Sequence, residues 1–306
     1  GPARSAARLV SLAARARELL LFGSLAVALA GCSRSPPPSQ FPTVRDAVER
    51  MHSTYACSRG VQGEAKLDYF GERGRVRGNV LYMTSAPDSV RFDVFSPFGV
   101  TLSTLTADGR DFALFDMKEK SFLRGPANTC NVARFTQVPV PPFALVQLLR
   151  GEAPVLVHEA SQASIAWEGG EYVLRVTSKH SATQEIHLEP HPEDWSAPWQ
   201  QQRVRVIEVR VAQHGMDLYQ AYLADHHAVQ TAPPRKDPEG LEPTIQPSGP
   251  ACNAEVPRRL RLVTPDTDQE LVLRNKEVMH NPPFPEGVFR QQPSRGVTVR
   301  HAACAD

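Results

Sequence analysis

The sequence predicts a mainly β protein with some α-helix: a curled antiparallel sheet, or incomplete β-barrel, with an N-terminal helix and a short plug helix on its concave face. Three observations support this. Apolar and polar residues alternate in many short runs, six such runs follow one another without a helix between them, and two stretches have helical spacing. Short strands joined by Gly and Pro turns are typical of antiparallel sheets rather than parallel α/β sheets.

The first helix is expected over residues 43–56. Thr43 and Asp46 form an acidic variant of a capping box at its start. The apolar residues that follow have the spacing of one helix face, which indicates an amphipathic helix packed against a sheet; they are Val44, Ala47, Val48, Met51 and Tyr55.

A hairpin is expected next, because apolar residues alternate along 61–69 and again along 76–82, with Gly71 and Gly74 between the two runs. Four further strands should follow at meander spacing. They are expected over residues 90–94, 99–107, 111–117 and 121–124.

The plug helix is expected over residues 143–150, after Pro142 and before Gly151. Its residues are apolar on most of the circumference. Because so short a helix is marginal in water, it should be held by burial against the sheet.

A second series of strands is expected after the plug helix, at 164–167, 171–177, 183–189, 203–212, 217–223, 258–264, 270–276 and 297–300. The apolar phase shifts within 203–212, from Val204 and Val206 to Ile207 and Val209, which indicates a bulge or a strand buried on both faces. Six prolines fall within residues 231–255, so this insertion should be a loop or linker.

Composition argues against several functions. The 34 basic and 33 acidic residues give no electrostatic footprint for nucleic acid. His187 and His191 would lie about 13 Å apart on one strand face at ~3.3 Å per residue, too far for one metal ion. No nucleophile elbow or free Cys/His pair appears. We therefore expect no enzyme, metal site or cofactor.

The N-terminus has the order of a secretory signal: a basic region, then an apolar run at 19–28 too short to span a bilayer. The sequence Leu29-Ala30-Gly31-Cys32 then resembles a bacterial lipobox. The resemblance implies a signal peptide over 1–31, cleavage before Cys32, and acylation of that cysteine. Residues 32–42 are Pro-rich and should form an extended tether. The residue next to the cysteine is Ser33 rather than Asp, which resembles the pattern of lipoproteins sorted to the outer membrane.

The remaining cysteines are an even set in an exported chain, which favours two disulfides. They are Cys57, Cys130, Cys252 and Cys304. Three connectivities are open, and free buried thiols are the alternative to any of them. The short separation of Cys252 and Cys304 favours that pair, with Cys57–Cys130 as the other.

The order of parts resembles the LolA/LolB family of bacterial lipoprotein-localisation proteins, and the lipidated N-terminus resembles the outer-membrane receptor LolB most. The likeness rests on Ser96-Pro97-Phe98-Gly99, on Pro142-Phe143 before Gly151, on the 257–262 strand, and on Asn281-Pro282-Pro283 with Val288-Phe289. It covers residues 43–301 and leaves a tail at 302–306. The insertion at 231–255 and the four cysteines depart from the family pattern.

The resemblance implies an outer-membrane lipoprotein, facing the periplasm, whose apolar cavity binds acyl chains of lipoproteins or another lipid. A periplasmic LolA-like carrier would be a partner, and the protein would be a monomer. The residues we expect to line the cavity are Tyr82, Phe92, Val94, Phe112 and Leu114 in the wall, and Phe143, Val146 and Leu149 in the lid. The alternatives are an ordinary filled core, a scaffold lipoprotein of an envelope assembly with an apolar patch near 231–255, and a hydrolase.

Phe98 lies between Pro97 and Gly99 at a turn between two strands, where a large apolar side chain has no obvious core position. We therefore expect it to point outward, and the resemblance implies that it contacts the membrane. The alternative is that it folds back to cap the core.

The lipobox predicts that Cys32 carries the membrane anchor. Two or more acyl chains give stable attachment where one is marginal. Cys32→Ala should therefore release the mature chain from the membrane or block its processing, as measured by fractionation. Labelled palmitate that still entered the variant would contradict the assignment.

Overall fold

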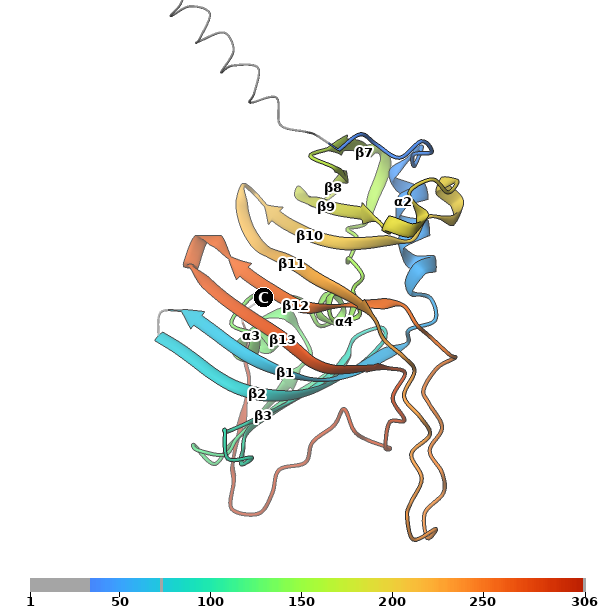
Figure 1. The fold of residues 1–306 in the computed structure, drawn as a ribbon. Helices are drawn as coiled ribbons and strands as arrows, with labels where there is room; N and C mark the ends of the chain where they lie inside the picture. The colour runs from blue at the N-terminus through green and yellow to red at the C-terminus, as the bar shows by residue number, and fades with distance from the viewer. Residues whose placement is uncertain (1–33, 72–73, 305–306) are drawn as a thin grey trace, which may run out of the picture. The chain divides into compact units, whose positions relative to one another are not determined.

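The computed structural model describes residues 34–71 and 74–304, and residues 37–304 form one compact unit. In this part of the chain, fourteen strands form one curved sheet with three α-helices (Figure 1). The strand order is β14-β6-β5-β4-β3-β2-β1-β13-β12-β11-β10-β9-β8-β7. The sheet does not close, since β14 and β7 are its two end strands. The predicted fold class is therefore confirmed.

The strands fall into two series that meet where β1 pairs with β13. The first series is β1 (Gly60–Gly71), β2 (Gly74–Ser85), β3 (Ser89–Phe95), β4 (Thr101–Asp108), β5 (Asp111–Asp116) and β6 (Ser121–Pro126). The second is β7 (His158–Glu168), β8 (Glu171–Ser178), β9 (Ala182–Pro190), β10 (Val204–Gln213), β11 (Met216–Ala228), β12 (Glu255–Thr264) and β13 (Gln269–His280), and β14 (Thr298–His301) ends the chain.

Neighbouring strands pair antiparallel throughout, except that β14 runs parallel to β6. The expected hairpin is present, with Tyr69 opposite Val76. The shift of apolar phase in 203–212 is a bulge, because the register of β10 against β9 shifts between Val206 and Glu208. This confirms the first of the two interpretations of that strand.

The helix α2 (Val44–Tyr55) matches the first predicted helix. Thr43 caps it by accepting a hydrogen bond from the Asp46 backbone N–H at 3.2 Å. Its buried face packs on β7 and β10, which agrees with the helical spacing of its apolar residues.

The plug helix is α4 (Pro142–Arg150), which begins with a proline and ends at Gly151 in the left-handed conformation (φ 92°). It packs against β1, β2, β3 and β12 near the middle of the sheet. A further helix, α3 (Thr129–Thr136), was not expected; it is capped by Asn128 and packs on β5. Together the three helices cover the apolar face of the sheet.

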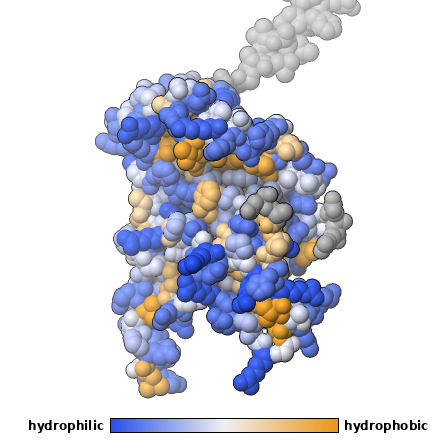
Figure 2. Space-filling model, turned by 180° about the vertical axis from the view of Figure 1, so that it is seen from behind, coloured by the Kyte–Doolittle hydropathy of each residue, from blue (hydrophilic) through white to orange (hydrophobic). Residues whose placement is uncertain are grey.

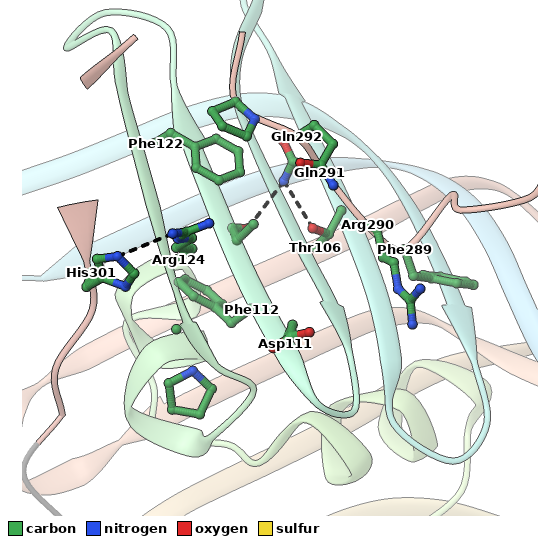
Figure 3. A pocket seen from close by; sticks show the side chains of 14 residues that line it. Thr106, Asp111, Phe112, Phe122, Arg124, Phe289, Arg290, Gln291, Gln292 and His301 are labelled. Atoms are coloured by element: carbon green, nitrogen blue, oxygen red, sulfur yellow. Dashed lines mark hydrogen bonds between the residues drawn. The ribbon is translucent and has the colours of Figure 1, made fainter. Parts of the chain in front are cut away.

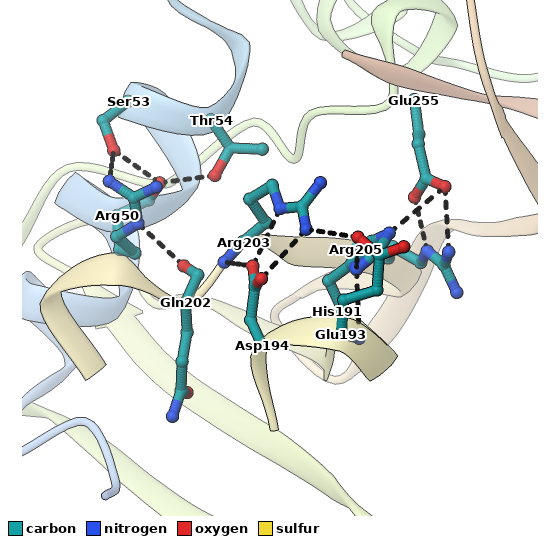
Figure 4. A network of polar contacts seen from close by, with 10 residues as sticks. All are labelled: Arg50, Ser53, Thr54, His191, Glu193, Asp194, Gln202, Arg203, Arg205 and Glu255. Atoms are coloured by element: carbon teal, nitrogen blue, oxygen red, sulfur yellow. Dashed lines mark hydrogen bonds and ion pairs between the residues drawn. The ribbon is translucent and has the colours of Figure 1, made fainter. Parts of the chain in front are cut away.

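A polar network attaches the segment just before β10 to α2 (Figure 4). The Arg50 side chain donates to the Gln202 carbonyl at 2.7 Å. Beside it, the Arg203 guanidinium donates to both carboxylate oxygens of Asp194, at 2.8 and 2.9 Å. Arg205 of β10 forms a two-bond pair with Glu255 of β12, so charge-assisted bonds also link these two strands across β11, which lies between them.

The Pro-rich insertion forms a loop over residues 229–254 that projects from the sheet between β11 and β12 (Figure 1). Two backbone hydrogen bonds between Arg235 and Ile245 join its limbs. The Asp237 carboxylate accepts from three backbone N–H groups, those of Glu239, Leu241 and Glu242, and so shapes the end of the loop. The Leu241 side chain is 80% exposed there.

Two disulfides are present, but the pairing favoured by sequence is wrong. Cys57 pairs with Cys252, and Cys130 pairs with Cys304, with Cα–Cα distances of 5.2 and 6.1 Å. The first joins the end of α2 to the base of the 229–254 loop. The second joins α3 to the C-terminus, which returns across β3–β6 to lie beside β6. Short separation along the chain therefore did not decide the pairing.

The disulfides make a testable prediction. Each closes a long loop, with sequence separations of 195 and 174 residues, so removing one should lower the free energy of unfolding by about 2–5 kcal/mol. The variant Cys130→Ser/Cys304→Ser should show this loss in urea unfolding. Peptide mapping of the unreduced chain should find only the two pairs named above, and a Cys57–Cys130 peptide would contradict the structure.

Candidate functional site

The predicted cavity residues lie mainly in one apolar cluster on the helix-covered face of the sheet. Tyr82, Phe92, Phe112, Val146 and Leu149 are at most 1% exposed. Val94 is also buried, and Leu114 is partly buried against the same cluster. Phe143 does not join them, because its side chain at the start of α4 is 49% exposed.

Side chains pack closely in this interior. The Tyr82 ring lies 6.1 Å from that of Phe92, and Phe92 lies 5.2 Å from Phe135 of α3, a residue that sequence reasoning missed. The Tyr82 hydroxyl donates to the Asn275 side-chain oxygen at 2.9 Å, while burial raises the pKa of the phenol. The interior is thus apolar with a few satisfied polar groups.

Four of the cavities among residues 34–71 and 74–304 have volumes of about 390, 330, 330 and 240 Å³. Of the eight predicted cavity residues, only Phe112 lines one of them. Pro97 lines both cavities of 330 Å³, beside the turn that follows β3. Apart from Phe112, the predicted interior residues therefore do not line these four cavities.

The C-terminal end of α4 is fixed by a buried polar cluster. The Arg150 guanidinium lies 3.2 Å from the Glu152 carboxylate and 3.4 Å from the Tyr55 carbonyl of α2. Glu152 also bonds the His52 ring. Burying charged groups is costly unless they are paired, so this cluster fixes α4 to α2 at one end. The N-terminal end of α4 has no such cluster among the contacts described.

The turn between β3 and β4 is held by local hydrogen bonds. The Gly99 N–H donates to the Ser96 carbonyl at 3.0 Å, and Gly99 has a positive φ of 78°. The Ser96 hydroxyl accepts from the N–H groups of Phe98 and Val100 at 3.3 and 3.2 Å. This arrangement leaves the Phe98 side chain 93% exposed. Its outward direction is confirmed, and its contact with a membrane stays a prediction.

Three more apolar side chains are exposed near Phe98. Val100 is in the same turn, Leu102 is the second residue of β4, and Met117 donates its N–H to the Leu102 carbonyl at 3.0 Å. We call Phe98, Val100, Leu102 and Met117 the apolar tip. Lys118 and Lys120 follow Met117 and are exposed. Elsewhere the surface in Figure 2 is mostly hydrophilic, with apolar side chains in separate patches.

The other predictions concern the N-terminal segment and the histidines. Cys32 and the signal segment 1–31 lie outside the described residues. Within those residues, no helix has the length and apolarity needed to cross a membrane. His187 bonds Glu171 and Glu185, whereas His191 lies near Glu193 and Glu255. Across residues 34–71 and 74–304, no group of three or more His, Cys, Asp or Glu is placed to hold a metal ion.

Solved structures similar to this chain include a putative outer membrane lipoprotein-sorting protein domain from Vibrio parahaemolyticus (10% identity, TM-score 0.47, covering 79% of this chain and 95% of that one). A LolA superfamily protein from Nitrosomonas europaea matches at 10% identity and TM-score 0.48, covering 82% and 99%. A DUF1329 family protein from Desulfovibrio piger matches at 9% and 0.49, covering 84% and 98%. No protein-family model and no curated protein matches the chain. At these values the likenesses do not decide its family or function.

The anchor of α4 predicts a pH dependence of stability. The hydrogen bond to Glu152 raises the pKa of His52 above its ordinary value of 6.5. A raised folded-state pKa means that the stabilisation is fully present below pH 6.5 and is lost as the pH rises through the higher value. His52→Gln should therefore lower the free energy of unfolding more at pH 6 than at pH 9, in urea titrations.

The exposed His180 provides the control for this comparison, since His180→Gln should have little effect at either pH. An equal loss for His52→Gln at pH 6 and pH 9 would contradict the proposed ion pair.

Proposed function

We propose that this chain is an outer-membrane lipoprotein whose domain binds acyl chains at the membrane surface. In this role it would act as a LolB-like receptor or carrier in the localisation of lipoproteins or other lipids. The single observation that carries the proposal is the apolar tip, in which Phe98 is held outward by a hydrogen-bonded turn.

The energetics of the tip favour contact with lipid. An exposed Phe contributes no burial energy to the fold, whereas moving it into an apolar phase gains about 1.5–3 kcal/mol. Val100, Leu102 and Met117 add partly exposed apolar surface beside it. Because the turn is already ordered in the free protein, little conformational entropy is lost when it docks.

Charge supports the same surface. Lys118 and Lys120 lie next to the tip on either side of the exposed Glu119. Each basic residue near an anionic membrane is worth about 1 kcal/mol, and the glutamate offsets part of this. Acylation at Cys32 would keep the domain at that membrane.

The extended tether predicted over 32–42 is shorter than expected, because residues 37–41 belong to the domain. Phe41 is 4% exposed and packs on Tyr172 and Trp199, and Ser39 accepts a hydrogen bond from the Trp199 N–H at 3.0 Å.

Acyl chains would enter between α4 and the sheet. The interior there is apolar, and each buried methylene contributes about 0.8 kcal/mol. The Arg150–Glu152–His52 cluster fixes the C-terminal end of α4, so we infer that the N-terminal end, which carries the half-exposed Phe143, moves to admit a chain. A periplasmic LolA-like carrier would deliver the cargo to the monomer, and no step needs a catalytic residue.

Substitution of Phe98 tests the proposal. Phe98→Glu in the unlipidated domain should change the free energy of unfolding by less than about 0.5 kcal/mol, because the side chain is exposed. Binding to vesicles containing anionic phospholipid should fall by about tenfold or more, since the apolar contact is lost. Sedimentation with vesicles measures the binding.

Val157→Glu is the matched control, because Val157 is 87% exposed and precedes β7. It should leave vesicle binding unchanged. Equal binding by Phe98→Glu and the unaltered domain would exclude the tip as a membrane contact. A large loss of stability would mean instead that Phe98 caps the core.

A second candidate, a scaffold lipoprotein that transports nothing, is favoured by two observations. The concave interior is packed with side chains, and Leu241 is 80% exposed at the end of the projecting 229–254 loop. In this case Leu241→Glu should disrupt the assembly recovered by crosslinking in cells, and no acyl lipid should bind the domain. The receptor proposal requires instead that acyl lipid binds the domain.

A further inference from the structure

The largest described cavity, of about 390 Å³, lies on the face of β4–β6 opposite to the helices (Figure 3). One row of paired residues forms much of its floor. Thr106 pairs with Ala113, Ala113 with Arg124, and Arg124 with His301 of β14. The C-terminal segment 288–293 crosses this row and forms the opposite wall.

The crossing segment is held in place by hydrogen bonds of three side chains, two arginines and one glutamine. Arg91 donates to the Val288 carbonyl at 3.1 Å, and Arg290 lies 2.7 Å from the Asp108 carboxylate. The Gln291 amide donates to the Thr104 and Ala113 carbonyls and to the Thr106 hydroxyl, at 3.0–3.2 Å. The cavity is therefore the part of the β4–β6 surface that the fixed segment 288–293 leaves uncovered.

Among the described residues, two of the arginines around the cavity have carboxylate partners, and a third does not. Arg91 has Asp93 as its partner, and Arg290 has Asp108. Arg124 has no carboxylate partner in residues 34–71 and 74–304; its guanidinium lies 3.4 Å from the Nε2 of His301. Two basic side chains thus meet at the mouth of the cavity, and Figure 3 shows them at the end opposite Arg290 and Phe289.

The rest of the lining is mixed. Phe289, Pro126 and Pro293 present apolar surface, whereas Phe112 and Phe122 are at most 2% exposed beneath it. Asp111 also lines the cavity and repels anions, so an anionic group is favoured only at the end that holds Arg124. A guanidinium without an acidic partner favours a carboxylate or phosphate, which it binds through two parallel N–H bonds. The volume lies within the range of small-ligand pockets.

We propose that this cavity binds an amphiphile with one anionic group, carboxylate or phosphate, which contacts Arg124 and His301 while its apolar part lies against Phe289 and Pro293. The site is separate from the concave interior, so it does not depend on the proposed function.

Titration calorimetry with three probes of equal chain length tests the inference on the whole 37–304 unit. Octanoate or octyl phosphate should bind, and octanol should bind about tenfold or more weakly, because it lacks the charge. Binding of octanoate alone would identify a carboxylate ligand, and binding of octyl phosphate alone would identify a phosphate ligand. Equal binding of octanol would overturn the proposal.

Arg124→Gln should weaken binding of the anionic probe about tenfold or more, and Arg124→Lys should weaken it less. Arg300→Gln is the matched control, because Arg300 is exposed on the same strand as His301 but does not line the cavity. Phe98→Glu should leave this binding unchanged. Equal affinities for Arg124→Gln and Arg300→Gln would place the anion elsewhere and overturn the inference.

Discussion

Burial of one apolar face of an open sheet is the constraint on which the rest of this structure depends. The sheet has fourteen strands and does not close, so its apolar face must be covered by other elements. The helices α2, α3 and α4 do this, each over a different group of strands. The pairing of β1 with β13 joins the two series of strands and keeps the face continuous. Each disulfide then ties another segment to this covering layer: Cys57–Cys252 joins the 229–254 loop to the end of α2, and Cys130–Cys304 joins the C-terminal segment to α3.

The same constraint separates the functional surfaces. Apolar residues that can be buried lie beneath the helices, whereas Phe98 and its neighbours remain exposed at a turn that local hydrogen bonds hold. On the opposite face, polar contacts of Arg91, Arg290 and Gln291 hold the C-terminal segment and leave a cavity with one unmatched arginine. Membrane contact, acyl binding and anion binding would thus use three different parts of one sheet.

Patterns of neighbouring residues predicted the hairpin, the bulge and the exposed turn, because each of these features is formed within a short stretch of the chain. Alternation along 61–82 predicted the β1–β2 hairpin, and the phase shift at Val206 indicated the β10 bulge. Gly99 after Pro97 indicated that Phe98 points outward. The helix α3 was missed because it is short, although Asn128 is a suitable cap. The disulfide pairing and the Arg124–His301 contact depend on the return of the C-terminus to β6, which no local pattern encodes.

The central claim is that the concave interior accepts an acyl chain although side chains fill it in the free protein. Native mass spectrometry of the domain, purified with the membrane fraction and gently released, tests this most directly. The account predicts a population whose added mass equals one lipid or acylated peptide, and which a Val146→Trp substitution in the buried face of α4 diminishes. A domain that carries no lipid at any protein concentration, and takes up none from vesicles, would contradict the claim and favour the scaffold.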